Sequence, residues 1–205
     1  LVRRASKRGT RVLTVSPGGD GNGPFSDARI RILPGTDRFL AAAVIRRFLE
    51  DRRPAERVIR AVRDYKAFRE MILSRSLEDL TARCGASLED VDELLRWYTE
   101  DGPVTTLVGA GLQRYRRGGE NVRFINALAM LSGHVGRSGG GTHYHLHSFA
   151  NVNLAWTKAP GNPARRSFLL PCIGREIQAA GDAGIRMLWV NGSNIVNQAP
   201  DIRRT

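Results

Sequence analysis

Cysteine is scarce in this sequence, and its placement excludes some kinds of site. Only Cys84 and Cys172 occur among the 205 residues, and neither belongs to a CxxC pair. That spacing argues against a structural zinc site or an iron–sulfur cluster, so we expect no metal ligands within the chain. No apolar run reaches the roughly 20 residues of a membrane-spanning helix, so we expect no direct insertion into a membrane.

The sequence also lacks the signs of a complete active site. No Walker-type lysine is present, which excludes P-loop chemistry. No spacing of serine, cysteine, histidine and acidic residues supports a Ser–His–Asp or Cys–His arrangement. The chain is therefore interpreted as a ligand binder and not as a self-contained catalyst.

Positive charge, in contrast, is abundant, with a formal net charge of +12. This charge favours polyanionic partners, namely nucleic acid, an acidic surface or a phosphate-bearing cofactor. The basic residues are scattered in short doublets, and a solvated surface explains most of them. A basic nucleic-acid-binding module would need them clustered with exposed aromatics, so this alternative is disfavoured and we expect no nucleic-acid partner.

Short β-prone runs alternate with helical patterns, which is typical of α/β layer folds. Strands are expected at residues 11–15, 28–33, 104–108 and 186–190, and a late helix at residues 173–180. We expect a layered, Rossmann-like sheet of mostly parallel strands with helices on both faces. Residues 1–150 would form an α/β cofactor-binding domain, and residues 151–205 the start of a second α/β segment.

Local signals mark several helix ends. The string Pro34-Gly35-Thr36-Asp37 ends the second strand and predicts an N-cap at Thr36 or Asp37, before an apolar helical stripe. Pro54 is expected in the first turn of another helix. Ser76 and Ser87 open two near-identical capping boxes, and the first of the two helices is expected to end at Gly85.

The most informative stretch is residues 104–142, where a strand stops at Gly109-Ala110-Gly111 and a helix follows a polar loop. This is a phosphate-binding geometry, because backbone N–H groups and the positive end of the helix dipole point at one spot. The third glycine of the nicotinamide fingerprint is absent, since position 114 is arginine. A nicotinamide-dependent Rossmann enzyme is therefore a second, weaker alternative.

All four histidines fall within residues 134–147. If residues 144–149 are extended, His143, His145 and His147 project from one face. Such a row could bind a metal, relay protons or line a polar funnel, but no Asp, Glu or Cys lies nearby to complete a zinc set. We keep the three as candidates for substrate contact, with a plain polar lining as the simpler interpretation.

Five motifs, in order along the chain, resemble the molybdopterin oxidoreductase family, which includes formate dehydrogenases, nitrate reductases and dimethyl sulfoxide reductases. Residues 3–18 resemble the family's basic helix, glycine, apolar strand and Asp-Pro-Arg, and Pro34-Gly35-Thr36-Asp37 matches the next motif verbatim. Residues 109–121 resemble G-x-G-x-x-(Q/R) followed by G-G-x-N. Residues 127–141 resemble A-L-x-x-L-x-G-N-x-G-x-x-G-G-G, and residues 188–195 resemble L-W-V-x-G-x-N-P.

The resemblance implies a bis(molybdopterin guanine dinucleotide) cofactor with molybdenum or tungsten, and it implies which residues would hold it. The guanosine end of one dinucleotide would contact Ser16, Pro17, Gly18, Gly35, Thr36 and Asp37. Its phosphate or pterin part would be approached by Ala110, Gly111 and Gln113. The second dinucleotide would contact Gly192, Ser193 and Asn194, and residues 143–153 would border the substrate funnel near the metal.

The sequence departs from the family at three points. Ser16-Pro17-Gly18 replaces Asp-Pro-Arg, His134 stands where asparagine is usual, and Ile195 stands where proline is usual. In the family, the protein ligand of the metal and the cysteines of a four-iron cluster precede the region that resembles this chain. We therefore expect the central portion of a larger oxidoreductase, which performs two-electron chemistry on a small-molecule redox substrate and can work with electron-transfer subunits.

Overall fold

The computed structural model describes residues 2–18, 23–100, 102–144, 153, 168–181 and 185–198. The chain divides into two compact units, Leu1–His147 and Ser148–Thr205, and each is described by itself. No helix in the described part of the chain is long and apolar enough to cross a membrane.

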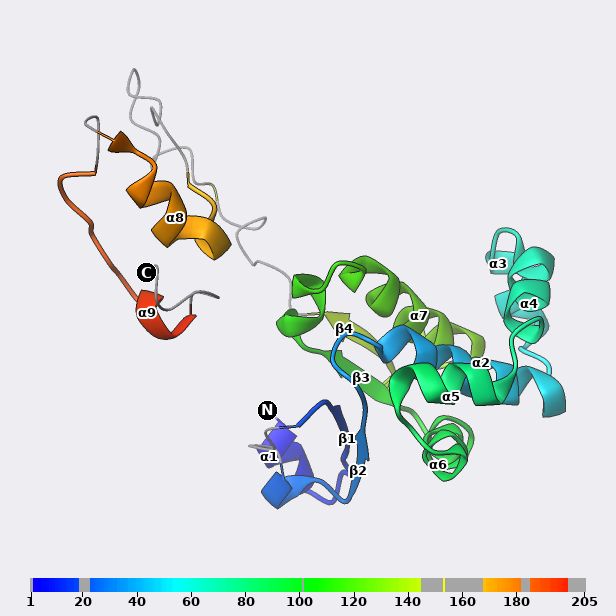
Figure 1. The fold of residues 1–205 in the computed structure, drawn as a ribbon. Helices are drawn as coiled ribbons and strands as arrows, with labels where there is room; N and C mark the ends of the chain where they lie inside the picture. Colours follow the sequence, from blue (N-terminus) through cyan, green and yellow to red (C-terminus); the bar gives the residue numbers. More distant parts are fainter. Residues whose placement is uncertain are drawn as a thin grey trace. The chain divides into compact units, whose positions relative to one another are not determined.

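The strands of the first unit form two parallel pairs (Figure 1). Strand β1 (Leu13–Ser16) pairs with β2 (Ala28–Arg31), and β3 (Thr105–Val108) pairs with β4 (Gly141–Tyr144). The three strands expected in this unit are confirmed; β1 is shifted and ends one residue later than expected, while β2 and β3 are shorter than expected. Parallel strands need a crossover, and helix α7 (Gly118–Leu131) supplies it between β3 and β4. The α/β class is thereby confirmed.

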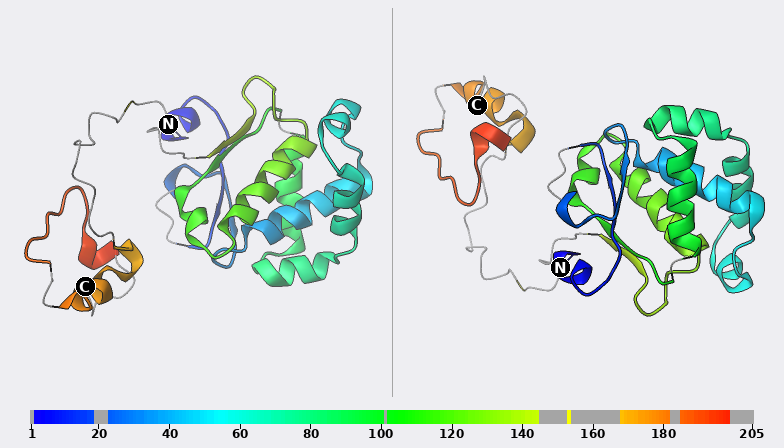
Figure 2. Two further views of the ribbon diagram at one scale, coloured as in Figure 1. Left: turned by 90° about the horizontal axis from the view of Figure 1, so that it is seen from above. Right: turned by 90° about the horizontal axis from the view of Figure 1, so that it is seen from below.

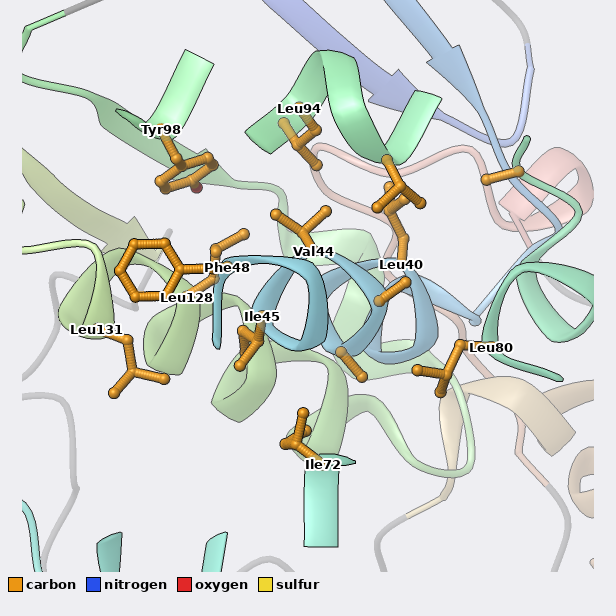
Figure 3. Close-up of a cluster of buried hydrophobic side chains, with 14 of the residues drawn as sticks. Leu40, Val44, Ile45, Phe48, Ile72, Leu80, Leu94, Tyr98, Leu128 and Leu131 are labelled. Atoms are coloured by element: carbon orange, nitrogen blue, oxygen red, sulfur yellow. The ribbon is translucent and has the colours of Figure 1, made fainter. Parts of the chain in front are cut away.

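The core is built around helix α2 (Asp37–Asp51), which begins directly after the turn of residues 34–37. A helix that is apolar on all sides belongs inside a protein, and residues 40–45 of α2 are all buried. Val44 and Ile45 point to opposite sides of α2, toward Leu94 and Ile72 respectively (Figure 3). Helices α5, α6 and α7 pack against α2. The first turn of α2 is therefore held in a fixed position relative to these three helices.

The remaining helices of the first unit surround this core. They are α1 (Val2–Ser6), η1 (Gly23–Phe25), α3 (Glu56–Ala61), α4 (Tyr65–Leu73), α5 (Leu77–Cys84), α6 (Leu88–Thr99) and η2 (Ala110–Arg114). Helices α3 and α4 lie at the end of the unit away from β1 and β2 (Figure 2).

Most of the predicted helix signals are confirmed. Ser76 accepts a hydrogen bond from Asp79 N, and Ser87 forms a complete capping box with Asp90. Gly85 ends α5 in the left-handed conformation, with φ of 71°.

Two expectations about helix starts were wrong in detail. Thr36 is the N-cap of α2, but its hydroxyl makes no capping bond and instead donates to Leu33 O at 2.5 Å. Pro54 precedes α3 without entering it, because the N-cap is Ala55.

The second unit contains η5 (Leu170–Cys172), α8 (Ile173–Gln178) and α9 (Ile195–Gln198). The helix expected at residues 173–180 is confirmed, but the buried strand expected at residues 186–190 is wrong. Met187 is 75% exposed and Trp189 82% exposed. A strand requires a hydrogen-bonded neighbour, and no strand in the described part of this unit pairs with these residues.

Candidate functional site

Loops of small and polar residues follow three strands of the first unit. The loop after β1 contains Ser16-Pro17-Gly18, in which Ser16 Oγ donates to Gly18 O at 3.0 Å and lies 3.2 Å from Gly18 N. The guanidinium of Arg31, at the end of β2, adjoins this loop: a Cβ at Gly18 would lie 3.6 Å from Arg31 Nη2. The carboxyl ends of β1 and β2 therefore meet, as expected for parallel strands in register.

The turn of residues 34–37 is tied to the start of α7 by side-chain hydrogen bonds. Asn121 Oδ1 accepts from Arg38 N and from Arg38 Nη1, both at 3.2 Å. Asn121 Nδ2 donates to Gly35 O at 3.2 Å, and Arg38 Nη1 donates to the same carbonyl at 3.0 Å. The structure thus brings the loop after β2 together with the segment that follows β3.

Gly35 lies against Tyr115, which belongs to that same segment. Its φ is 75°, and a Cβ at this position would lie 2.8 Å from Tyr115 Cγ and Cδ1. A side chain would need an unfavourable backbone conformation and would displace the ring. Glycine at position 35 is therefore explained by the protein itself.

Gly109 and Gly111 have no such explanation. Neither has a positive φ, and a Cβ at either position would meet no atom within 4 Å. The described residues thus do not require glycine at the end of β3. Bare backbone at a strand end is what the close approach of a phosphate or a ring needs, so these two positions fit a ligand that covers them.

The same end of the unit carries more cations than anions. Arg31, Arg114 and Arg116 are exposed and have no ion pair among the described residues. The nearby carboxylates are Asp37, at the start of α2, and Glu120, which lies 3.5 Å from Arg38 and 3.7 Å from Arg117. The excess positive charge favours an anionic ligand.

Asp37 and Gln113 complete the predicted contacts in this unit. Burial raises the pKa of the Asp37 carboxyl, and a backbone hydrogen bond and the charge of Arg38 oppose this change. Ala110 begins η2, directly after Gly109, while the side chain of Gln113 lies outside the described part of the structure.

The histidines separate into different roles. His134 is 3% exposed, and its Nδ1 accepts from Val104 N at 3.2 Å, so Nε2 carries the proton and donates to Tyr98 O at 2.8 Å. It is a brace between α6 and β3. His143 is exposed on β4, opposite Leu107, and His145 and His147 lie outside the described residues. Within the described part, no group of three His, Cys, Asp or Glu residues could hold a metal ion.

A polar cavity of about 310 Å³ lies elsewhere in the first unit. Its lining includes Phe48, Arg52, Tyr98, Glu100, His134 and Arg137. These residues come from the C-terminal parts of α2 and α6 and from the segment after α7, and none belongs to the glycine loops. The cavity is therefore separate from the candidate site.

In the second unit, Gly192-Ser193-Asn194 lies directly before α9 and is exposed. Gly192 has a φ of 64°, so it needs glycine for its conformation. These residues were predicted to hold a second dinucleotide, which stays a prediction.

Sequence reasoning missed Arg38, Tyr115 and Asn121, which connect the loops. The spacing G-G-x-N at residues 118–121 was the available signal for Asn121. Nothing local marks its partners, because the hydrogen bonds span 83 and 86 residues.

The parallel strand pairs, of which β3 and β4 are joined through helix α7, define an α/β protein. The open glycine backbone at the basic end of β3 is a candidate site for an anionic ligand. No family model matches the chain. It is 31% identical over 208 residues to a probable oxidoreductase, YyaE, of Bacillus subtilis, covering 99% of this chain and 31% of that protein. It is 25% identical over 146 residues to formate dehydrogenase H of Escherichia coli, covering 69% and 20% respectively.

Two further likenesses point the same way. The assimilatory nitrate reductase of Haloferax mediterranei is 27% identical over 136 residues, covering 66% of this chain and 18% of that enzyme. The structure of acetylene hydratase from Pelobacter acetylenicus superposes with a TM-score of 0.58 at 14% identity, covering 64% of this chain and 18% of that one, and so supports the fold.

Formate dehydrogenases and a nitrate reductase are thus homologues of this chain, in agreement with the resemblance of its five motifs to the molybdopterin oxidoreductase family. The chain spans about a third or less of the length of these relatives.

Proposed function

We propose that residues 1–205 are the central cofactor-binding portion of an oxidoreductase that uses molybdenum or tungsten bound to two pterin guanine dinucleotides. The observation that carries this proposal is the open backbone at Gly109 and Gly111, beside a turn that is tied to the same segment. The homologous formate dehydrogenases and nitrate reductase support this kind of ligand, and the basic strand end supplies the matching charge.

The residues present fit one dinucleotide in the first unit. The loop of residues 16–18 and the turn of residues 34–37 would hold the guanosine, and Ala110, Gly111 and Gln113 would approach the phosphate or pterin. Backbone N–H groups suit the binding of a phosphate because they donate hydrogen bonds from fixed positions. Gly192, Ser193 and Asn194 would serve the second dinucleotide.

When bound, the metal–pterin group supplies the two-electron chemistry, and the protein contributes binding, orientation and electrostatics. His143, His145 and His147 would border the approach of a small redox substrate. The whole enzyme would pass electrons to or from partner subunits, and a four-iron cluster would belong to another part of it. The protein ligand of the metal would likewise belong to another part of the enzyme.

The test is a Gly111→Asp change in the full-length protein. A carboxylate at this open position would repel a phosphate and occupy the space that the ligand needs, so metal and pterin content should fall by at least tenfold. Ala67→Asp on α4 is the matched control, since it adds the same charge at an exposed position away from the strands. Its cofactor content should equal that of the wild type.

Unchanged metal and pterin in the Gly111→Asp protein would contradict the proposed site. Mass and absorbance spectra of the released ligand would also separate a pterin nucleotide from a nicotinamide nucleotide.

A further inference from the structure

Asn121 is the most deeply buried polar side chain described in the first unit, with an exposed fraction of 0%. Burying an amide is unfavourable unless its hydrogen-bonding groups find partners. The other buried polar residues serve their own surroundings: Thr81 bonds within α5, and His134 braces β3 against α6. Asn121 differs because its partners, Gly35 and Arg38, lie at the turn of residues 34–37 and the start of α2.

The amide of Asn121 makes three hydrogen bonds, and each goes to residues 35–38. Its oxygen accepts from the backbone and the guanidinium of Arg38, and its nitrogen donates to Gly35 O. An amide can donate and accept at once, which neither a carboxylate nor an apolar side chain of this size can do. Asparagine at position 121 can therefore satisfy both the donors of Arg38 and the carbonyl of Gly35.

Arg38 strengthens the same connection. One guanidinium nitrogen bridges Gly35 O and Asn121 Oδ1, and Nε lies 3.5 Å from Glu120 Oε2. The guanidinium also lies 4.3 Å from the ring centroid of Phe39, which limits its freedom. The ion pair with Glu120 is exposed to water and adds little, so Asn121 is the residue of α7 that holds the Arg38 side chain.

The connection lies between two loops that would touch the ligand. Gly35 belongs to the turn of residues 34–37, and Asn121 lies in the first turns of α7, after the segment that begins at Gly109. Tyr115, from this same segment, fills the space against Gly35. The position of one loop relative to the other is therefore set by Asn121 and its partners.

We propose that Asn121 is a positioning residue, which through Gly35 and Arg38 fixes the guanosine-side turn relative to the glycine backbone after β3. This inference rests on the proposed function, because it concerns the same dinucleotide. Asn121 itself is fully buried, so it would act through its partners and not by contact with the ligand. Its effect is to keep the turn in the conformation that binds, so that binding does not have to order it.

The experiment compares Asn121→Leu and Asn121→Asp in the full-length protein. Leucine removes all three hydrogen bonds at similar volume, whereas aspartate keeps the acceptor for Arg38 and loses only the donor to Gly35 O. Ile45→Val in the core is the control for a general loss of stability. Glu120→Gln is the control for the exposed ion pair, since it leaves the amide bonds of Asn121 intact.

Two quantities are measured at a temperature at which every variant is folded. One is hydrogen exchange at the Arg38 amide, and the other is the GMP released by acid hydrolysis per polypeptide. Asn121→Leu should speed exchange at Arg38 at least tenfold and lower GMP at least fivefold, with Asn121→Asp between it and the wild type. Ile45→Val and Glu120→Gln should each change both quantities less than twofold.

Unchanged exchange at Arg38 in Asn121→Leu would overturn the proposal. It would also be overturned if Ile45→Val, at an equal loss of thermal stability, lost as much GMP. A wild-type protein without GMP would contradict the proposed function instead, and exchange at Arg38 would still decide whether Asn121 holds the turn.

Discussion

Gly35 and Gly111 are both glycines of the candidate site, yet the protein treats them differently. Gly35 has a positive φ and contacts Tyr115, whereas Gly111 has neither a positive φ nor a neighbour within 4 Å of an added Cβ. The fold explains the first glycine, whereas the second is not required by its described surroundings and would be explained by the proposed ligand. Substitution by alanine separates these two kinds of requirement.

Gly35→Ala should lower the free energy of unfolding by about 1–3 kcal/mol, because a left-handed alanine is strained and its methyl group meets the ring of Tyr115. Gly111→Ala should change it by less than about 0.5 kcal/mol. Chemical denaturation of the cofactor-free full-length proteins measures both. Equal losses for the two variants would contradict the distinction.

Asp37 should make stability depend on pH. Burial raises the pKa of its carboxyl above the ordinary value of 3.8, so folding favours the protonated form. That favourable contribution is fully present below the unfolded pKa and is lost as pH rises through the folded pKa.

Asp37→Asn should therefore stabilise the protein at pH 7, and the gain should disappear near pH 3. Denaturation midpoints across this pH range check the expectation, with Glu70→Gln, an exposed carboxylate on α4, as the control. A destabilised Asp37→Asn protein at pH 7 would show that the charge of Asp37 is favourable in the fold.

At the level of elements, the N-caps of α5 and α6 are expected to differ in how much they stabilise the fold. Ser76 supplies one capping bond, whereas Ser87 belongs to a reciprocal box in which Asp90 Oδ2 also accepts from Ser87 N at 2.8 Å. Ser87→Ala should lower the free energy of unfolding by about 1 kcal/mol, and Ser76→Ala by the same or less. Urea denaturation would contradict this ranking if Ser76→Ala were the more damaging change.

The elements also show how far sequence reasoning reaches. The caps at Ser76 and Ser87 were predictable because capping is a matter of four neighbouring residues. The strand expected at residues 186–190 failed because a β-prone sequence becomes a strand only beside a partner. Thr36 failed as a capping side chain because its backbone, with φ of −107° and ψ of 9°, lacks the extended conformation of a usual N-cap residue.

The candidate site was predictable in its parts but not in its assembly. Spacing and motifs indicated the loops at Gly35 and Gly111, since glycine and strand ends are visible in sequence. The contacts that join them were not visible, because Asn121, Arg38 and Tyr115 acquire their roles only once α2 and α7 pack together. Likewise the sequence marked His134 only as one of four histidines within residues 134–147, and its buried bonds to Val104 and Tyr98 place it in the scaffold.

For the molecule as a whole, the parallel pairs, the basic strand end and the relatives support one account. The net charge of +12 fits a protein that holds phosphates, and three exposed arginines in the first unit lie near the loops that would do so. The second unit contributes its own glycine turn at residue 192. The central claim is that the loops at Gly35 and Gly111 bind one guanine dinucleotide.

An experimental structure of the full-length protein purified with its metal and pterin tests this claim most directly. The account predicts a guanine dinucleotide whose guanosine contacts residues 34–37, with its phosphates or pterin at hydrogen-bond distance, about 3 Å, from the backbone at Gly111. A dinucleotide bound away from both loops, or loops that contact only other protein segments, would contradict it.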